Sequence, residues 1–282
     1  MKLVRYGRPG MERPGIVDRD GRVRSLAGHV ADVAGAWLLP RSLERLRSID
    51  IQTLPVVDAD ARLGPCVGAV GKVVCVGLNY SDHAAEAGLA MPDEPVLFMK
   101  ATSAISGPND PVVLPVGSTK ADWEVELAVV IGAPAKNVAA QGAERHVAGY
   151  CVVNDVSERA FQLETSGQWV KGKSADTFAP MGPWLVTPDE VPDPGQLNMW
   201  LDVDGVRRQT GTTATMIFDV PYVVAYVSRF MSLQPGDVIS TGTPPGVGMG
   251  FDPPVWLAPG NVMRLGIDGL GIQEQVVVAA EE

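Results

Sequence analysis

The sequence predicts a β-rich α+β protein with a curled or rolled sheet and few helices. Short apolar segments typical of strands outnumber helical patterns, and the regular strand–helix alternation of a parallel α/β fold is absent. Among the 282 residues, 23 Pro and 31 Gly are scattered throughout, which predicts many turns. Hydrophobic residues make up 46% and charged residues 20%, as in a folded globular protein rather than a disordered or fibrous one.

We expect two domains, a small α+β domain over residues 1–70 and a larger one over 71–282. In the first, short β-type segments surround a turn at Asp20-Gly21 and predict a small meander. Helical spacing follows over 39–54, with Ser42 as a candidate N-cap. A segment rich in Pro and Gly then leads to the boundary.

The larger domain opens on a buried-strand pattern that ends in a turn near residue 80. A short helix is expected over 81–89, with Ser81 as N-cap and Gly88 at its end. A longer helix is expected over 219–232, capped by Asp219. The expected strands are 96–99, 123–131, 149–155, 197–203, 206–210, 237–241, 262–267 and 272–278. Of these, 197–203 and 206–210 are expected to form a tight hairpin.

Composition excludes several classes of partner. Lys and Arg number 23 against 33 Asp and Glu, a formal charge of −10, whereas nucleic-acid-binding surfaces are basic. The 3 cysteines form no CxxC pair, so we expect neither a disulfide framework nor a zinc–thiolate site, and a reducing cytoplasm fits best. No apolar run reaches the roughly 18 residues of a membrane span. The start of the chain has no apolar segment of a signal peptide.

Three acidic residues are candidate metal ligands. Glu124 and Glu126 are two apart in an expected strand, so both side chains project from one face, and Val125 and Leu127 take the other. This pattern also fits the solvated face of an amphipathic strand, but the strand continues into an apolar run, and adjacent carboxylates repel without a cation. Asp155 ends another buried-type strand, where it is either a helix cap or a ligand.

The other ionisable residues indicate which metal ion the site is expected to bind. Only 3 His exist, which argues against a His-rich zinc or iron centre, and carboxylate oxygens favour Mg²⁺ or Mn²⁺. His83 and Glu86 are three apart in the expected short helix and so share a face. Such a pair can act as a general base on water, although a simple contact on a helix surface explains it equally well.

Three further segments offer polar groups to a pocket. A helix starting near 157 would place Arg159 and Gln162 on one face, where they could meet an anion, or lie on the surface. Lys171 and Lys173 alternate along an expected extended segment, so one of the two could enter a pocket. The glycine-rich segment 240–250 lacks the pattern of a nucleotide-binding loop, but Thr241 and Thr243 could hold a carboxylate with free backbone N–H groups.

Together and in this order, these segments resemble the fumarylacetoacetate hydrolase family, and the start of the chain is similar to bacterial members of the ureidoglycolate lyase and 2,4-diketo-3-deoxy-L-fuconate hydrolase type. The resemblance covers about residues 70–272. It rests on GLNYSDHAAEAG, LFMKATSAISGPND, DWEVELAVVIG, GYCVVNDVSERAFQ, KGKSADTFAPMGPWLVT, GDVISTGTPPGVG and PGNVMRLGIDGLG.

The resemblance implies a fold, a cofactor and site residues. The fold would be the family's mixed β-sandwich roll with a small N-terminal domain, and the molecule would be a homodimer. The cofactor would be Mg²⁺, with Mn²⁺ or Ca²⁺ as substitutes. Lys100 and Tyr80 lie in matching segments without an implied role. The implied sites are the metal ligands Glu124, Glu126 and Asp155, the catalytic residues His83, Glu86 and Lys173, and the substrate-binding residues Arg159, Gln162 and Thr243.

The implied activity is hydrolysis of a C–C bond in an acylpyruvate or a 2,4-diketo (sugar) acid, which releases pyruvate. The same site could instead decarboxylate oxaloacetate-like acids, or isomerise or hydrate oxo-dienoates. A non-enzymatic domain with a structural cation is a third interpretation, but a structural ion needs no His–Glu base. The segment 81–95, with little apolar content, is expected to be mobile without ligand and to close over the substrate.

Overall fold

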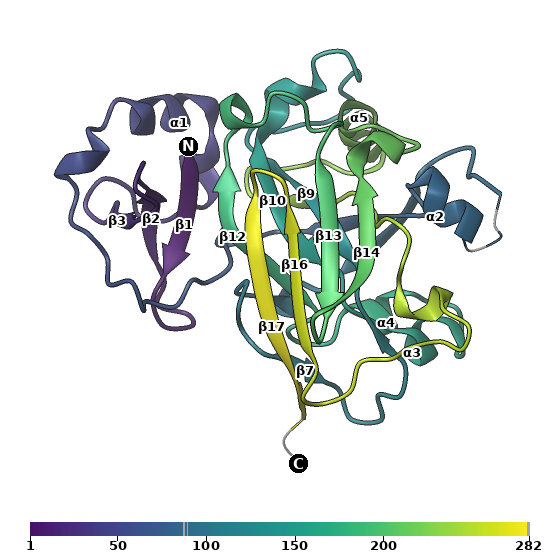
Figure 1. The fold of residues 1–282 in the computed structure, drawn as a ribbon. Coiled ribbons are helices and arrows are strands. Elements are labelled where there is room, and N and C mark those ends of the chain that lie inside the picture. Colours follow the sequence, from purple (N-terminus) through teal and green to yellow (C-terminus); the bar gives the residue numbers. More distant parts are fainter. Residues whose placement is uncertain (87, 89, 281–282) are drawn as a thin grey trace.

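The computed structural model of the protein describes residues 1–86, 88 and 90–280. A ten-stranded sheet forms the centre of the molecule (Figure 1). In spatial order its strands are β3 (Val23–Ser25), β2 (Arg13–Val17), β1 (Lys2–Tyr6), β12 (Ala179–Val186), β10 (Val147–Asn154), β9 (Val125–Ile131), β15 (Val238–Ser240), β4 (Val73–Gly77) and β5 (Val96–Lys100), and β6 (Ile105–Ser106) pairs with β12.

A five-stranded sheet packs in front of β9, β10 and β12 (Figure 1), so the architecture is the expected mixed β-sandwich roll. Its order is β14 (Val206–Thr212), β13 (Asn198–Val203), β16 (Val262–Ile267), β17 (Gly271–Ala279) and β7 (Val112–Leu114). A two-stranded ladder joins β8 (Ala121–Asp122) to β11 (Ser157–Glu158).

The helices are short and lie at the periphery. The α-helices are α1 (Pro40–Arg47), α2 (Ser81–Glu86), α3 (Arg159–Leu163), α4 (Val170–Lys173) and α5 (Val220–Phe230). The 3₁₀ turns span Gly35–Leu38, Ile51–Thr53, Thr102–Ala104, Ala143–His146, Pro188–Glu190, Thr213–Thr215 and Gly248–Gly250. Among the residues that the structure describes, every helix falls short of the length and apolarity that a bilayer crossing requires.

Strand β9 is buried on both of its faces. Leu127 and Val129 belong to the core between the two sheets. Ala128 and Val130 belong to a second core, which the first 70 residues complete from the other side. Because side chains alternate along a strand, Glu124 and Glu126 fall on the same face as this second core. The acidic pair therefore lies inside the molecule, as the apolar continuation of the strand predicts.

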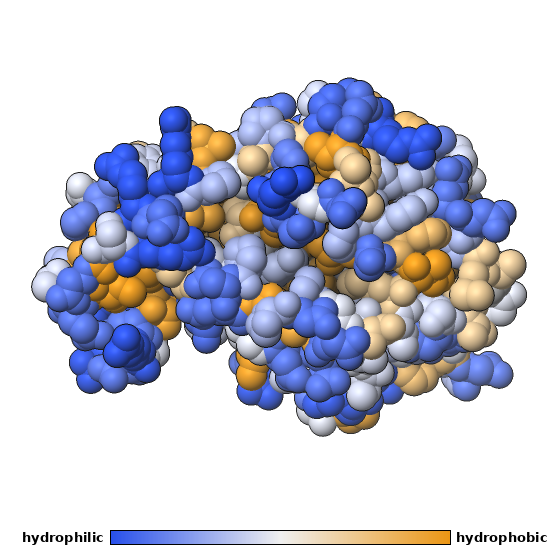
Figure 2. All heavy atoms as spheres, turned by 90° about the horizontal axis from the view of Figure 1, so that it is seen from above, coloured by the Kyte–Doolittle hydropathy of each residue, from blue (hydrophilic) through white to orange (hydrophobic). Residues whose placement is uncertain are grey.

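The first strands of the chain extend the central sheet at one edge. Strand β1 pairs antiparallel with β12, with Lys2 opposite Val186. Arg62 also contacts Glu12 and Asp110, which links the start of the chain to a loop beyond residue 100. In Figure 2 this part forms the smaller lobe at the left, and hydrophobic patches are scattered over a largely hydrophilic face. The division at residue 70 stays a prediction.

Several local expectations are confirmed. Asp219 caps α5, accepting the Tyr222 N–H at 2.9 Å. The β13–β14 hairpin turns through Asp204 and Gly205, whose φ angles of 52° and 75° are those of a tight turn. Arg159 opens a helix, α3. Part of the expected helix over 81–89 falls on residues 87 and 89, outside the described residues, and α2 covers Ser81–Glu86.

Other expectations are wrong. The helix expected over 39–54 is α1, which ends at Arg47; Ser42 lies inside it, and its hydroxyl donates to the Ala36 carbonyl instead of capping. Residues 170–173 form the helix α4 rather than the expected extended segment. Lys171 is nevertheless exposed and Lys173 buried, which is the arrangement expected for alternating side chains of an extended segment. Strand β12 was not expected, because its Pro and Gly residues resemble a loop.

Candidate active site

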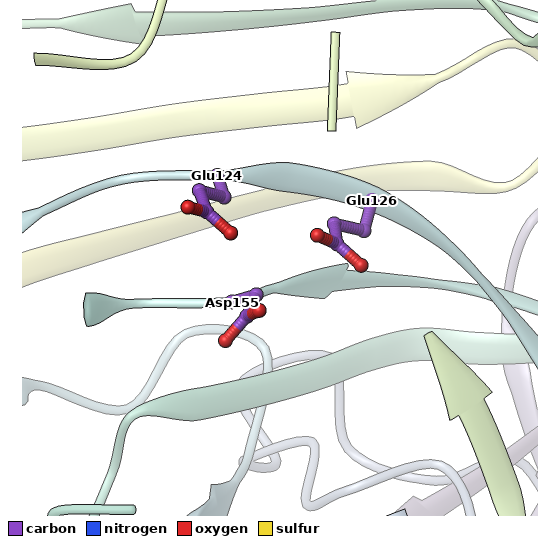
Figure 3. A group of neighbouring side chains, drawn as sticks. All are labelled: Glu124, Glu126 and Asp155. Carbon is purple, nitrogen blue, oxygen red and sulfur yellow. The ribbon is translucent and has the colours of Figure 1, made fainter. Parts of the chain in front are cut away.

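Three carboxylates meet where β9 begins and β10 ends. Glu124, Glu126 and Asp155 each offer an oxygen within 4.8 Å of the others, and all three are buried. The antiparallel pairing brings them together, since Glu126 stands opposite Val153 and the Asp155 N–H donates to the Glu124 carbonyl at 2.9 Å. Figure 3 shows Glu124 and Glu126 projecting from one side of their strand toward the segment that carries Asp155. This donor set fits a hard divalent cation.

Three buried cations surround these acids. Lys173 Nζ lies 2.7 Å from Glu124 Oε2 and 2.8 Å from Asp155 Oδ2. Lys100 Nζ donates to Asp155 Oδ1 at 2.5 Å and to the Val156 carbonyl at 3.0 Å. Each ammonium thus satisfies one oxygen of Asp155, which is why that carboxylate tolerates complete burial.

The guanidinium of Arg159 is the third cation. Its Nη2 lies 2.6 Å from Glu124 Oε1, and its Nε donates to Asp122 Oδ2 at 2.8 Å. Its Nη1 donates to Gln162 Oε1 at 3.0 Å, so Arg159 and Gln162 share one face of α3, as their spacing predicts. Asp122 also accepts the N–H groups of Gly248 and Met249, and so fixes the glycine-rich loop to the same cluster.

The two glutamates differ in acidity. Burial opposes ionisation of Glu124, but Lys173 and Arg159 outweigh it and lower the pKa of Glu124 to about 2. Burial and the charges of Asp155 and Glu124 raise the pKa of Glu126 well above its ordinary value. Burial works against the charged form of Lys173, yet the neighbouring carboxylates raise the pKa of this lysine.

The glycine-rich segment supports Glu126. The Glu126 Oε2 atom accepts hydrogen bonds from the Ser240 hydroxyl at 2.5 Å and from the Gly242 N–H at 2.9 Å. The expectation of free backbone N–H groups is wrong for Thr241, whose N–H donates to the Leu127 carbonyl at 3.0 Å. Thr243 lines the pocket, and its hydroxyl donates to the Val125 carbonyl. The carboxylate that this segment holds is therefore one of the protein's own.

The His–Glu pair lines the same pocket as Glu124 and Glu126. His83 Nδ1 is 3.0 Å from Glu86 Oε2, and both residues belong to α2. The other oxygen, Glu86 Oε1, accepts the Gly246 N–H at 2.9 Å. One carboxylate thus orients the imidazole and attaches α2 to the glycine-rich loop.

These groups line one cavity of about 510 Å³, the size of a small-ligand site. Eight of the nine expected site residues line it, and Asp155, which is 0% exposed, lies behind them. The polar lining consists of His83, Glu86, Glu124, Glu126, Arg159, Gln162, Lys173 and Thr243. The apolar lining consists of Val76, Leu78, Phe98, Leu163, Trp169, Val247 and Met249.

Several residues contribute to the site without a role predicted from the sequence. Asp122 extends the alternation of Glu124 and Glu126 by one step, a signal that was available in the sequence. Lys100 and Ser240 belong to strands that are distant in the sequence, and only the order of strands in the sheet brings them to the site. Tyr80 lies in the core, where its hydroxyl contacts Met199 Sδ at 3.4 Å, and it does not line the cavity.

The fold and the cavity define a β-rich roll whose pocket combines an acidic cation site with a His–Glu pair. The chain belongs to the fumarylacetoacetate hydrolase family, because the model of the fumarylacetoacetate (FAA) hydrolase C-terminal domain matches residues 72–278. A Burkholderia multivorans protein that is named only as a hydrolase is 61% identical over 281 residues, which cover 99% of this chain and 100% of the relative.

Solved structures agree with this assignment. The fumarylacetoacetate hydrolase of Exiguobacterium antarcticum is 36% identical with a TM-score of 0.89, and the match covers 99% of this chain and 100% of the other. The maleylpyruvate hydrolase of Sphingobium sp. SYK-6, in complex with manganese(II) and pyruvate, is 32% identical with a TM-score of 0.83. The 2-hydroxyhepta-2,4-diene-1,7-dioate isomerase of Mycobacterium marinum is 34% identical with a TM-score of 0.79. The last two matches cover both chains completely.

Proposed function

We propose that this protein is a Mg²⁺-dependent hydrolase of a C–C bond in an acylpyruvate or 2,4-diketo acid, with pyruvate as one product. The observation that carries the proposal is one cavity that joins a buried Glu–Glu–Asp cluster to a His–Glu pair. The manganese and pyruvate in the complex of the Sphingobium relative support it.

The carboxylates of Glu124, Glu126 and Asp155 would hold the cation. When bound, it would polarise the keto oxygen of the substrate and offset the negative charge of an enolate. Mg²⁺ fits the all-oxygen donor set, and Mn²⁺ or Ca²⁺ could replace it.

His83 is the proposed general base. Its Nδ1 is engaged by Glu86, which leaves Nε2 to take a proton from water. The hydroxide adds to the distal carbonyl carbon, and the bond between that carbon and the methylene breaks. Its electron pair forms the pyruvate enolate, and the acyl group leaves as a carboxylic acid. The proton held by His83 then passes to the methylene carbon, which completes pyruvate.

Lys173 is positioned to stabilise the enolate. An ammonium has three N–H donors, and Glu124 and Asp155 occupy two of them. The third can donate to the enolate oxygen, while Arg159, Gln162 and the backbone N–H of Thr243 hold the carboxylate and keto oxygens. Removing one such donor typically costs ~10²–10³ in rate.

The test is steady-state pyruvate release from acetylpyruvate and from oxaloacetate at saturating Mg²⁺. His83→Ala should abolish acetylpyruvate cleavage but leave Mg²⁺ affinity nearly unchanged. Lys173→Met should damage turnover of both substrates, because both pass through the same enolate. Matched controls are His29→Ala and Lys171→Met, since both residues are exposed and neither lines the cavity. Full hydrolysis by His83→Ala would refute the assigned base.

The alternative is a decarboxylase of oxaloacetate-like acids, or an isomerase or hydratase of oxo-dienoates, at the same site. The name of the Mycobacterium marinum relative favours the isomerase among these. Decarboxylation needs no attacking water, so it should fall less in His83→Ala than hydrolysis does. A wild-type protein that decarboxylates oxaloacetate or isomerises an oxo-dienoate, but releases no pyruvate from acylpyruvates, would establish the alternative.

A further inference from the structure

We infer that the substrate carries one carboxylate only and that its acyl end is apolar, seated on Phe98 and Trp169. This inference rests on the proposed function and narrows it to acylpyruvates with an alkyl or aryl group on the distal carbonyl. It sets this chain apart from relatives whose names specify dicarboxylic acids, such as maleylpyruvate and a heptadienedioate.

The cavity has a direction. Lys173 Nζ lies 5.0 Å from the ring centroid of Phe98, and the Phe98 ring meets that of Trp169 edge to face at 5.3 Å. Phe98 therefore contacts both a cation of the acidic cluster and Trp169. A diketo acid whose carboxylate end lies at the cation site would extend its acyl end along this aromatic pair.

The cavity also has exposed apolar walls. Leu163 and Met249 line it and are 44% and 41% exposed, although both are large hydrophobic side chains. A ligand with an apolar tail would cover them, which is favourable at roughly 25 cal/mol per Å². Trp169 packs on the backbone of Gly77, where an added Cβ would stand 2.8 Å from the indole ring, so the indole is fixed in place.

The charges of the cavity suit a single carboxylate. Asp122, Glu124, Glu126 and Asp155 supply four negative charges, and Lys100, Lys173 and Arg159 supply three positive ones. A bound divalent cation would leave the cluster with one net positive charge. One substrate carboxylate neutralises it, whereas a second would remain unpaired and share the cavity with Glu86.

The hydrogen-bond donors lead to the same conclusion. Among the described residues, the cationic side chains that line the cavity are those of Arg159 and Lys173. Their contacts with Asp122, Glu124, Asp155 and Gln162 leave each of these two side chains about one free N–H donor. The carboxylate and keto oxygens of the substrate use these. Along the aromatic pair, Phe98 offers no side-chain donor and Trp169 offers only its neutral indole N–H, so a second carboxylate there would exchange its hydration for at most one neutral hydrogen bond.

The test compares two acylpyruvates of equal length. Butyrylpyruvate carries a propyl group on the distal carbonyl, and succinylpyruvate carries a carboxyethyl group, so a methyl replaces the second carboxylate. We expect kcat/KM for butyrylpyruvate to exceed that for succinylpyruvate by at least about tenfold. An equal or reversed preference would overturn the inference while leaving the proposed function intact.

A binding assay separates the inference from catalysis. On the Mg²⁺-loaded protein, calorimetry should show 2-oxohexanoate binding at least about tenfold more tightly than 2-oxoadipate, its counterpart with a terminal carboxylate. Trp169→Lys should reduce or reverse this preference by adding a cation, and Trp169→Phe should retain it. If wild type binds in the expected order but cleaves neither acylpyruvate, the proposed function fails and the inferred acyl site stands. Tighter binding of 2-oxoadipate to wild type would refute the site.

Discussion

At the scale of single residues, Glu126 differs from the other two acids of the cluster. Glu124 and Asp155 each contact a buried ammonium, whereas Glu126 accepts hydrogen bonds from the neutral Ser240 hydroxyl and Gly242 N–H. Its burial and the neighbouring negative charges raise its pKa above the ordinary 4.5. The folded protein without metal therefore retains a proton there that the unfolded chain loses. Its stability should fall as pH rises from 4.5 through the raised pKa.

We predict that Mg²⁺ affinity rises with pH through the raised pKa of Glu126 and levels off above it, because the cation must displace this proton. Calorimetric titration between pH 5 and 8.5, in buffers of different ionisation enthalpy, measures both the affinity and the released proton. Ser240→Ala removes a hydrogen bond to the charged form, so it should shift the rise to higher pH.

The control for this shift is Ser106→Ala, a buried serine that does not line the cavity. Glu126→Ala should lose Mg²⁺ binding. Affinity that is flat across the pH range, or unchanged in Glu126→Ala, would contradict the assignment of Glu126 as a ligand.

Lys100 has a larger structural role than its sequence segment indicated. We predict that Lys100→Met destabilises the metal-free protein by about 3–5 kcal/mol, because Asp155 would keep a buried oxygen without its partner. Urea denaturation measures the free energy of unfolding, and Lys136→Met, at an exposed lysine, is the control. A loss below about 1 kcal/mol would mean that Asp155 does not depend on this pair.

At the scale of elements, α2 joins the His83–Glu86 pair to the glycine-rich loop. The Glu86 carboxylate hydrogen-bonds with His83 Nδ1 and accepts the Gly246 N–H. The position of α2 and the orientation of the imidazole therefore depend on one carboxylate. Farther along the segment 81–95, Glu94 accepts the Tyr226 hydroxyl of α5 at 2.7 Å. Near its start, the Ser81 hydroxyl donates to the Thr215 carbonyl and Asp82 accepts the Thr215 hydroxyl, so the segment is attached to the body at several points.

We predict that amide hydrogen exchange over 81–95 slows when Mg²⁺ and oxalate, an enolate mimic, are added together. Closure over a ligand would protect the exposed end of α2 and the Gly246 N–H. Peptides from β16, remote from the cavity, should exchange equally in both states. Equal exchange of 81–95 with and without oxalate would show that this segment is not a lid.

Elements were predictable where the signal is local. Asp219 caps α5 and Asp204-Gly205 turns a hairpin, because both depend on a few adjacent residues. The pairing of Glu124 with Glu126 was predictable from strand alternation, whereas Asp155 joins them through the pairing of β9 with β10. Strand β12 was not, since it owes its structure to pairing with β10 and β1 despite Pro180 and Gly182. The aromatic part of the cavity was also invisible, because Phe98 and Trp169 are 71 positions apart.

At the scale of the whole molecule, the apolar run at 222–227 is the kind of segment that a dimer interface could bury. The structure places most of this run in the core, with Val223, Val224 and Val227 each 0% exposed. It therefore gives no support to an interface. Apolar side chains on the outer face of β17 remain uncovered, and Ile272 and Val276 are 44% and 46% exposed.

We predict a homodimer of twice the chain mass of 29.8 kDa, from the resemblance to the family. Sedimentation velocity measures it directly. If β17 contributes to the interface, Ile272→Asp should shift the molecule toward monomer, whereas Val116→Asp, at a residue 84% exposed, should not. A single species at the chain mass in wild type would reject the dimer.

The second core has a consequence for how this chain can change over evolutionary time. Gly132, just after β9, has no room for a Cβ, which would stand 2.9 Å from the Leu38 carbonyl and from Ala148. The small residues Gly132 and Ala148, at the end of the β9–β10 pair away from the acidic cluster, are thus fitted to the first 40 positions of the same gene. A lineage that exchanges its N-terminal segment by recombination must also adjust Gly132, Ala148 and their neighbours. We therefore expect the two regions to be inherited together and to accumulate compensating substitutions in pairs.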